Sequence, residues 1–102
     1  MFDVTLLSDT KEGSIRKAVF NPCGMVCSSQ IEIELDGDVI RYIRFTDGCS
    51  GNTQGVAALA EGRSPQEIVR ILKGIRCGAK PTSCPDQLAQ ALEQAMAREA
   101  QA

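Results

Sequence analysis

Five cysteines in a chain of 102 residues constrain the fold more than any other feature of the sequence. They are Cys23, Cys27, Cys49, Cys77 and Cys84. None of them lies inside an apolar periodic stretch, where inert core cysteines usually occur. Two are followed directly by glycine, and Cys84 stands between a serine and a proline. All five fall in turn-like segments, where the backbone can bend to bring thiolates together, and this favours a metal site over separate buried thiols.

The other residue types narrow the chemistry that these thiols could perform. The chain has no histidine, which excludes Ser-His-Asp and Cys-His catalysis and any histidine ligand to zinc. No Cys-x-x-Cys pair is present, so the spacing matches neither a thioredoxin-type redox pair nor a standard zinc finger. From the residues alone three interpretations remain: buried free thiols, redox thiols and, with most support, a metal site.

The start of the sequence and the odd number of cysteines predict a cytoplasmic protein with reduced thiols. Residues 1–5 show no basic segment leading into a long apolar one, as a secretion signal would. No apolar run approaches the roughly 20 residues that cross a bilayer. An odd number of cysteines also fits poorly with a closed disulfide framework.

Size and charge predict one small domain, residues 1–102, that binds neither membranes nor nucleic acids. If the chain were divided into two domains, each domain would have too few residues to form a hydrophobic core of its own. The formal charge is −2, from 11 basic and 13 acidic side chains, so there is no basic field to attract a phosphate backbone. Aromatic residues make up 4% and tryptophan is absent, which disfavours a platform for base stacking.

Alternation of apolar and charged residues predicts a β-hairpin in the first half of the chain. Ile31, Ile33 and Leu35 alternate with glutamates, and the sequence Asp-Gly-Asp that follows is a turn signal. Residues 39–45 return as a second strand, whose arginines would face Glu32 and Glu34 across the hairpin. Residues 1–20 are patterned weakly: short strands at both ends flank a polar stretch, residues 8–14, that is predicted to be a loop.

Three helices are predicted after this hairpin, the first at about residues 52–61. The second has a capping box, with Ser64 as the N-cap, Pro65 at the first helical position and Glu67 at the third. The third starts at Ser83 or Cys84, and its tail, residues 97–102, is expected to fray. The expected core-facing stripes are Ile68, Ile71, Leu72 and Ile75 in the second helix and Leu88, Ala91, Leu92, Ala95 and Met96 in the third.

Strands followed by helices predict an α+β fold, with about three helices on one face of a small antiparallel sheet of two to three strands. The core is expected at about residues 20–96, and residues 1–19 form an N-terminal strand or loop extension. The helix starts matter because the positive end of a helix favours the thiolate that a metal needs. Cys84 would begin the last helix, and Cys49 would directly precede the first.

Three charged residues lie near these cysteines in the sequence. They are Asp47, Lys80 and Asp86. Each could tune a site, but for each of them a plain surface role is the expectation.

The sequence around the last cysteines resembles the TSCPD-domain family. Residues 82–86 read Thr-Ser-Cys-Pro-Asp, the string that names the family, and the segments around Cys27 and Cys49 look like its two upstream motifs. The resemblance covers about residues 20–95 and implies a metal site formed by Cys27, Cys49, Cys77 and Cys84. The domain also occurs as a C-terminal module of coenzyme-B12-dependent ribonucleotide reductases. This implies a reductase-associated role, although the chain is too short to hold a reductase barrel.

A looser resemblance is to NifU-like iron–sulfur scaffold proteins. Their three motif cysteines have counterparts here at Cys23, Cys49 and Cys84, which would be the scaffold ligands. Met25 replaces the scaffold's aspartate, and Ser83 replaces its histidine. A transfer scaffold needs a labile cluster, whereas four thiolates close a tetrahedral site and hold their metal tightly. The two resemblances together imply a scaffold-like fold with a permanent site, in which Cys23 is an alternative or additional ligand.

The expected metal follows from the ligand type and the size of the domain. Four thiolates suit zinc or an iron–sulfur cluster, and zinc is favoured because a small domain benefits from a structural metal. We therefore expect a metal-binding module that serves a protein partner, such as a ribonucleotide reductase or a cluster-assembly component. The alternatives are an iron–sulfur scaffold or carrier and a thiol redox or sulfur-transfer protein. No catalytic residue stands out, so no enzymatic activity is expected from the chain alone.

Overall fold

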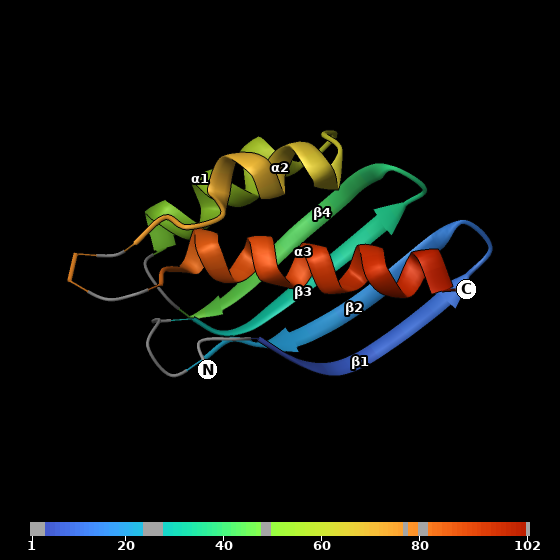
Figure 1. The fold of residues 1–102 in the computed structure, drawn as a ribbon, viewed down its shortest axis with the longest axis horizontal. Helices are drawn as coiled ribbons and strands as arrows, with labels where there is room; N and C mark the ends of the chain where they lie inside the picture. Colours follow the sequence, from blue (N-terminus) through green and yellow to red (C-terminus); the bar gives the residue numbers. More distant parts are fainter. Residues whose placement is uncertain (1–3, 24–27, 48–49, 77, 80–81, 102) are drawn as a thin grey trace.

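The computed structural model describes residues 4–23, 28–47, 50–76, 78–79 and 82–101. Within these residues, four antiparallel strands form one sheet in the order β1-β2-β3-β4 (Figure 1). The strands are β1 (Thr5–Glu12), β2 (Ile15–Asn21), β3 (Ser28–Asp36) and β4 (Val39–Asp47). The predicted α+β class is confirmed, whereas the prediction of two to three strands is corrected to four.

The N-terminal hairpin accounts for this correction. β1 and β2 pair from Thr5 and Asn21 through to Glu12 and Ile15, so residues 8–12, predicted to be part of a loop, are strand. The turn is confined to residues 13–14, where Gly13 has a φ of 62°. The first strand lies at the edge of the sheet and most of its side chains are exposed. Its sequence therefore lacks the apolar alternation that marks a half-buried strand.

The predicted hairpin of β3 and β4 is confirmed. Ile31, Ile33 and Leu35 are buried, and Ile33 lies opposite Ile43 on β4. The turn between the strands contains Gly37, whose φ of 61° is open to glycine at no steric cost. This alternation fixes which face of the sheet lies against the core.

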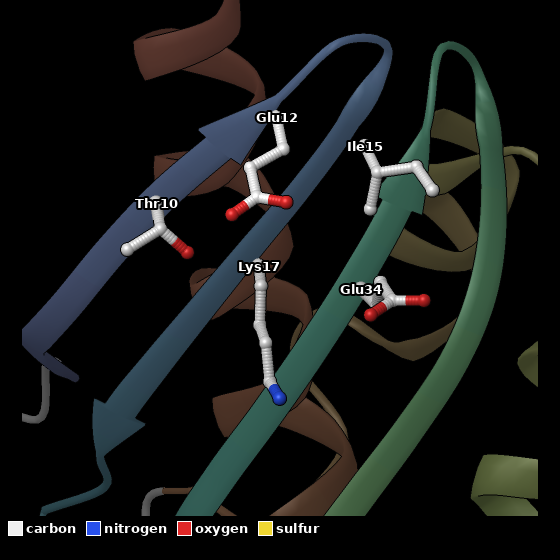
Figure 2. Close-up of a pocket in the computed structure, with 5 residues that line it drawn as sticks. All are labelled: Thr10, Glu12, Ile15, Lys17 and Glu34. Carbon is white, nitrogen blue, oxygen red and sulfur yellow. The ribbon is translucent and has the colours of Figure 1, made fainter.

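The opposite face of the sheet is polar and open. The predicted pairing of glutamates with arginines occurs there: Glu34 Oε2 lies 3.1 Å from Arg41 Nε, and Glu32 lies opposite Arg44. A shallow pocket also opens on this face, toward the turn between β1 and β2 (Figure 2). Its lining residues are Thr10, Glu12, Ile15, Lys17 and Glu34.

The helices lie over the other face of the sheet (Figure 1). They are α1 (Ser50–Ala60), α2 (Pro65–Leu72) and α3 (Cys84–Gln101). The serine half of the predicted capping box of α2 is present, because Ser64 Oγ accepts a hydrogen bond from the Glu67 backbone N–H at 3.2 Å, while Glu67 Oε2 lies 3.6 Å from Arg63 Nη1. The turn between α1 and α2 meets β4, where Gly62 N–H donates to the Ile40 carbonyl at 2.8 Å.

The predicted apolar stripe of α2 is only half right. Ile68 is buried, but Ile71 is 56% exposed. Ile75 lies beyond the end of the helix and is 41% exposed. The helix is short, and its Ile71 side faces away from the core, where it lines a shallow apolar pocket together with Leu59 of α1. Pro65 and Ile68 are buried, and Val69 and Leu72 pack against the core, so one face of α2 makes contact along the length of the helix.

The stripe predicted for α3 forms the centre of the core. Leu88, Ala91, Leu92 and Ala95 are fully buried, and they pack in one cluster with residues of the sheet that include Phe20 and Ile31. Val4 and Ala18 belong to the same cluster, so the segment expected to be an extension contributes to the core. The helix continues to Gln101, through the tail for which fraying is predicted. None of the helices in the described part of the chain is both long and apolar enough to cross a bilayer.

Candidate thiol site

The five cysteines divide into two that the structure describes and three that it does not. Cys23 is partly exposed and Cys84 is buried. Among the described residues, neither takes part in a disulfide. Cys27, Cys49 and Cys77 lie outside the described residues.

The neighbours of Cys27 and Cys49 are opposite each other in the sheet. Ser28, which follows Cys27, pairs with Asp47, the last residue of β4. The first helix then begins at Ser50, immediately after Cys49. Ser28 and Asp47 therefore lie together at one end of the β3–β4 hairpin.

The remaining cysteine segments meet at this end of the molecule. β2 ends at Asn21, two residues before Cys23, and α3 begins at Cys84. Figure 1 shows the ends of β2 and β4 and the starts of α1 and α3 at one end of the sheet, and the described residues that follow α2, 73–76, run toward the same end. The pocket of Figure 2 lies toward the other end and on the opposite face, so it is a separate feature.

The start of α3 explains the position of Cys84. Ser83 is the N-cap, because its Oγ accepts from the Asp86 N–H at 3.2 Å and its carbonyl accepts from the Gln87 N–H at 2.8 Å. Cys84 is thus in the first turn of the helix, as predicted, and its exposed fraction is only 9%. The positive end of the α3 dipole favours negative charge at this position.

Asp86 departs from the surface role that was expected of it. Only 7% of the residue is exposed. Its Oδ1 accepts from the Gly74 N–H at 2.7 Å, and its Oδ2 accepts from the Thr82 hydroxyl and from Gln90 Nε2, the latter at 3.3 Å. The pattern Ser-x-x-Asp at residues 83–86, a variant of the capping box, is the sequence signal that could have located it.

The other two charged residues have different outcomes. Asp47 is exposed at the end of β4, with a φ of 62°, and its Oδ2 accepts from Ser29 Oγ at 2.8 Å. It has the surface role that was expected. Lys80 lies outside the described residues, so its expected role stays a prediction.

Gln87 is the site residue that sequence reasoning missed. It is fully buried, and its Oε1 accepts a hydrogen bond from the Cys23 backbone N–H at 2.9 Å. Its Nε2 donates to Thr82 Oγ1 at 3.0 Å. Because Gln87 lies one helical turn after Cys84, this bond holds the Cys23 backbone beside the first turn of α3. A glutamine in a helix carries no periodic signal that would have revealed this contact.

Comparison with protein families decides where the chain belongs. The family model of the TSCPD domain matches residues 7–96, nearly the whole chain. The protein belongs to the TSCPD domain family. Residues 82–86, the TSCPD string, are those that begin α3 and form the buried hydrogen bonds described above. No curated protein and no solved structure matches the chain, so the NifU-like resemblance has no support from relatives.

The fit of a metal to this TSCPD domain depends on the donor atoms that the chain offers. Within the described ranges, no group of three or more His, Cys, Asp or Glu side chains gathers as a metal site would require. Three of the four predicted ligands lie outside those ranges. The donor set fits, since the sequence offers five thiols and no imidazole, and thiolates suit zinc and iron–sulfur clusters. The ligand set Cys27, Cys49, Cys77 and Cys84 stays a prediction.

Proposed function

We propose that this protein is a small cytoplasmic metal-binding module with a thiolate site formed by Cys27, Cys49, Cys77 and Cys84. One observation supports this most: the described neighbours of all the cysteines gather at one end of the sheet (Figure 1). Five cysteines scattered at random in a domain of this size would not be expected to share one end. Convergence of thiols from separate segments is what a tetrahedral metal site requires.

Zinc is the metal proposed for the site. A bound zinc ion would join segments that are far apart in the sequence and would add its binding free energy to the stability of the fold. The residues themselves supply the setting: α3 begins at Cys84, and Gln87 holds the Cys23 backbone beside this helix start. Cys23 is thereby an additional ligand or a neighbouring thiol.

The partner is proposed from the family. TSCPD domains resemble the C-terminal module of coenzyme-B12-dependent ribonucleotide reductases, so we propose that the partner is a reductase of this kind. The module would act as an accessory to the partner's chemistry.

An iron–sulfur carrier is the second candidate, and the position of Cys23 favours it. A fifth cysteine whose backbone is held against the first turn of α3 could exchange with one of the four ligands, which a closed zinc site does not need. On this alternative the chain would release its cluster to an acceptor, and the partner would be a component of cluster assembly.

Metal analysis of protein purified without oxygen tests the proposal. We expect about one zinc ion per chain and no visible colour. Cys27→Ser, Cys49→Ser, Cys77→Ser and Cys84→Ser should each lose zinc and lower the melting temperature. Removal of zinc by a chelator should lower the melting temperature of the unmodified protein in the same way. Iron with acid-labile sulfide would select the carrier instead, and the absence of both metals would refute the metal-binding function.

A further inference from the structure

The first turn of α3 holds two other segments of the chain by side-chain hydrogen bonds. A helix start of this kind needs only its cap, which Ser83 provides. The side chains of Asp86 and Gln87 reach beyond the helix, and each contacts a segment that carries a cysteine. Burying a polar side chain costs free energy unless the side chain is hydrogen-bonded. Capping alone does not explain why Asp86 and Gln87 are both buried in one turn, and their other hydrogen bonds indicate a second role.

Gln87 fixes Cys23. The glutamine amide is fully buried, and both of its ends are engaged. Since the Cys23 N–H can only donate, the amide oxygen must face it, and the amide nitrogen then faces Thr82 Oγ1. The orientation of the side chain is therefore set by its surroundings, and the backbone at Cys23 is held against α3.

The side chain of Asp86 holds the chain at Gly74, three residues before Cys77, by a hydrogen bond. Its Oδ1 accepts from Gly74 N–H at 2.7 Å, just after α2 ends. One residue further on, the Ile75 carbonyl accepts from Ser83 Oγ at 2.6 Å. Two successive residues, two and three positions before Cys77, are thus bound to the same turn of the same helix.

Thr82 links the two contacts. Its hydroxyl accepts from Gln87 Nε2 and donates to Asp86 Oδ2, and the residue is fully buried. The three side chains form one connected chain of hydrogen bonds between the Cys23 backbone and the residues before Cys77. Buried networks in which every member is satisfied hold their members in one geometry.

We infer that Asp86 and Gln87 are positioning residues of the thiol site, with Gln87 placing Cys23 and Asp86 placing the segment of Cys77 against the helix that begins at Cys84. The inference rests on the proposed function in one respect, that these thiols form a common site. It assigns a role to Thr82 and Asp86 of the TSCPD string and to Gln87, which follows the string: they hold the Cys23 backbone and the residues before Cys77 at one helix start.

The test is the alkylation rate of each cysteine by N-ethylmaleimide, read by mass spectrometry on metal-free, reduced, folded protein. Gln87→Met keeps the side-chain size and removes both hydrogen bonds. It is expected to raise the rate at Cys23 by about twofold to tenfold, the effect of losing one net hydrogen bond, with Cys84 unchanged. Gln94→Met is the matched control, because Gln94 also lies on α3 and donates to a backbone carbonyl, that of Val4, at 3.1 Å.

Asp86 is tested by the same readout at Cys77. Asp86→Ala is expected to raise the rate at Cys77 relative to Cys84, whereas Asp86→Asn keeps an oxygen for the Gly74 N–H and should restore a slow rate. If these variants do not fold, Thr82→Val removes only the linking hydroxyl at nearly constant volume. It should raise the rates at Cys23 and Cys77 together and leave Cys84 slow.

The outcomes separate a positioning role from plain stabilisation. If all cysteines become reactive together in Gln87→Met or Asp86→Ala, the residues only stabilise the fold and the inference is wrong. Unchanged rates at Cys23 and Cys77 would overturn it as well. Zinc competition with a chelator should show weaker binding in Gln87→Met than in Gln94→Met. If the unmodified protein binds neither zinc nor iron, the proposed function fails, while the alkylation rates still decide the positioning role.

Discussion

Arg98, close to the end of α3, donates a hydrogen bond from Nε to Oδ2 of Asp9 on β1 at 2.5 Å, across 89 positions of the sequence. Arg16 on the neighbouring strand donates from Nη1 to both oxygens of the same carboxylate, at 2.7 and 2.6 Å. The Asp9 side chain is only 9% exposed. A single carboxylate therefore joins the N-terminal hairpin to the far end of the last helix.

The pH dependence of stability should report this cluster. Burial acts to raise the pKa of Asp9, but the hydrogen bonds and charges of Arg98 and Arg16 outweigh it and hold the pKa below the ordinary value of 3.8. A lowered pKa contributes stability that is complete above the ordinary value and is lost as the pH falls through the folded-state value. We expect the free energy of unfolding, measured with urea, to fall below about pH 4 more steeply in the unmodified protein than in Asp9→Asn.

The same variant should be less stable at neutral pH. Asp9→Asn is expected to lower the free energy of unfolding by about 1–3 kcal/mol, because charge-assisted hydrogen bonds are lost and Arg16 stays buried. Glu61→Gln, an exposed acidic residue at the end of α1, is the control and should change little. Equal losses in the two variants would show that net charge, not this cluster, is responsible.

Tyr42 gives a second titration that can be observed directly. Burial and a hydrogen bond from the phenol to Glu32 raise the pKa of Tyr42 above 10.0, although Lys17 acts in the opposite direction. A raised pKa contributes stability that is present below the ordinary value and lost as the pH rises through the folded-state value. Tyr42 is the one tyrosine in a chain without tryptophan, so phenolate absorption measures it alone.

The variant for this titration is Glu32→Gln, which removes the negative charge beside the phenol. Its phenolate midpoint should lie below that of the unmodified protein and closer to the ordinary value. Glu61→Gln removes a charge of the same sign at an exposed position outside the sheet, so it should leave the midpoint in place. The assignment would be wrong if both variants moved the midpoint equally.

The N-cap of α2 is expected to matter for stability. Ser64→Ala removes the acceptor of the Glu67 N–H and should lower the free energy of unfolding by about 1 kcal/mol. Ser8→Ala, at an exposed position of β1, is the matched control. Chemical denaturation of both variants checks this, and a Ser64→Ala protein as stable as Ser8→Ala would contradict the role of the cap.

The free energy of unfolding lost when an apolar side chain is truncated should depend on how deeply that side chain is buried. Leu92 of α3 is fully buried, and Leu92→Ala is expected to lower the free energy of unfolding by about 2–5 kcal/mol through lost apolar contact and the cavity left behind. Leu59 of α1 is 68% exposed, so Leu59→Ala should change it by about 0.5 kcal/mol or less. Thermal unfolding of the pair measures the difference, and similar losses would place Leu59 in the core.

The parts of the fold that the sequence predicts correctly are those with local signals. The hairpin around Gly37 shows strict alternation, and the start of α2 has its capping box at Ser64. The first strand has neither, because an edge strand can be exposed on most of its length. Ile71 shows the opposite error, a residue predicted to be buried that is exposed. It continues the helical period of α2, but none of the described elements covers its side of the helix enough to bury it.

At the thiol site, too, the features with local sequence signals are predicted and the long-range contacts are not. The sequence predicts that Cys84 begins α3, because Ser83, Pro85 and Asp86 together mark a helix start. It does not predict that Gln87 binds the Cys23 backbone, 64 positions away, since such a contact depends on how the sheet and the helix meet. Long-range hydrogen bonds between a side chain and a distant backbone leave no periodic trace in a sequence.

The position of α3 at the end of the element order has a consequence for synthesis of the chain. The apolar face of the sheet, with Phe20, Ile31 and Ile33, is covered centrally by Leu88 and Leu92. Both hairpins leave the ribosome before this cover exists, so the nascent chain exposes an apolar sheet that can associate with other chains. Docking of α3 is what buries this face, so a chaperone that holds the sheet until the helix has been made would raise the yield of native protein.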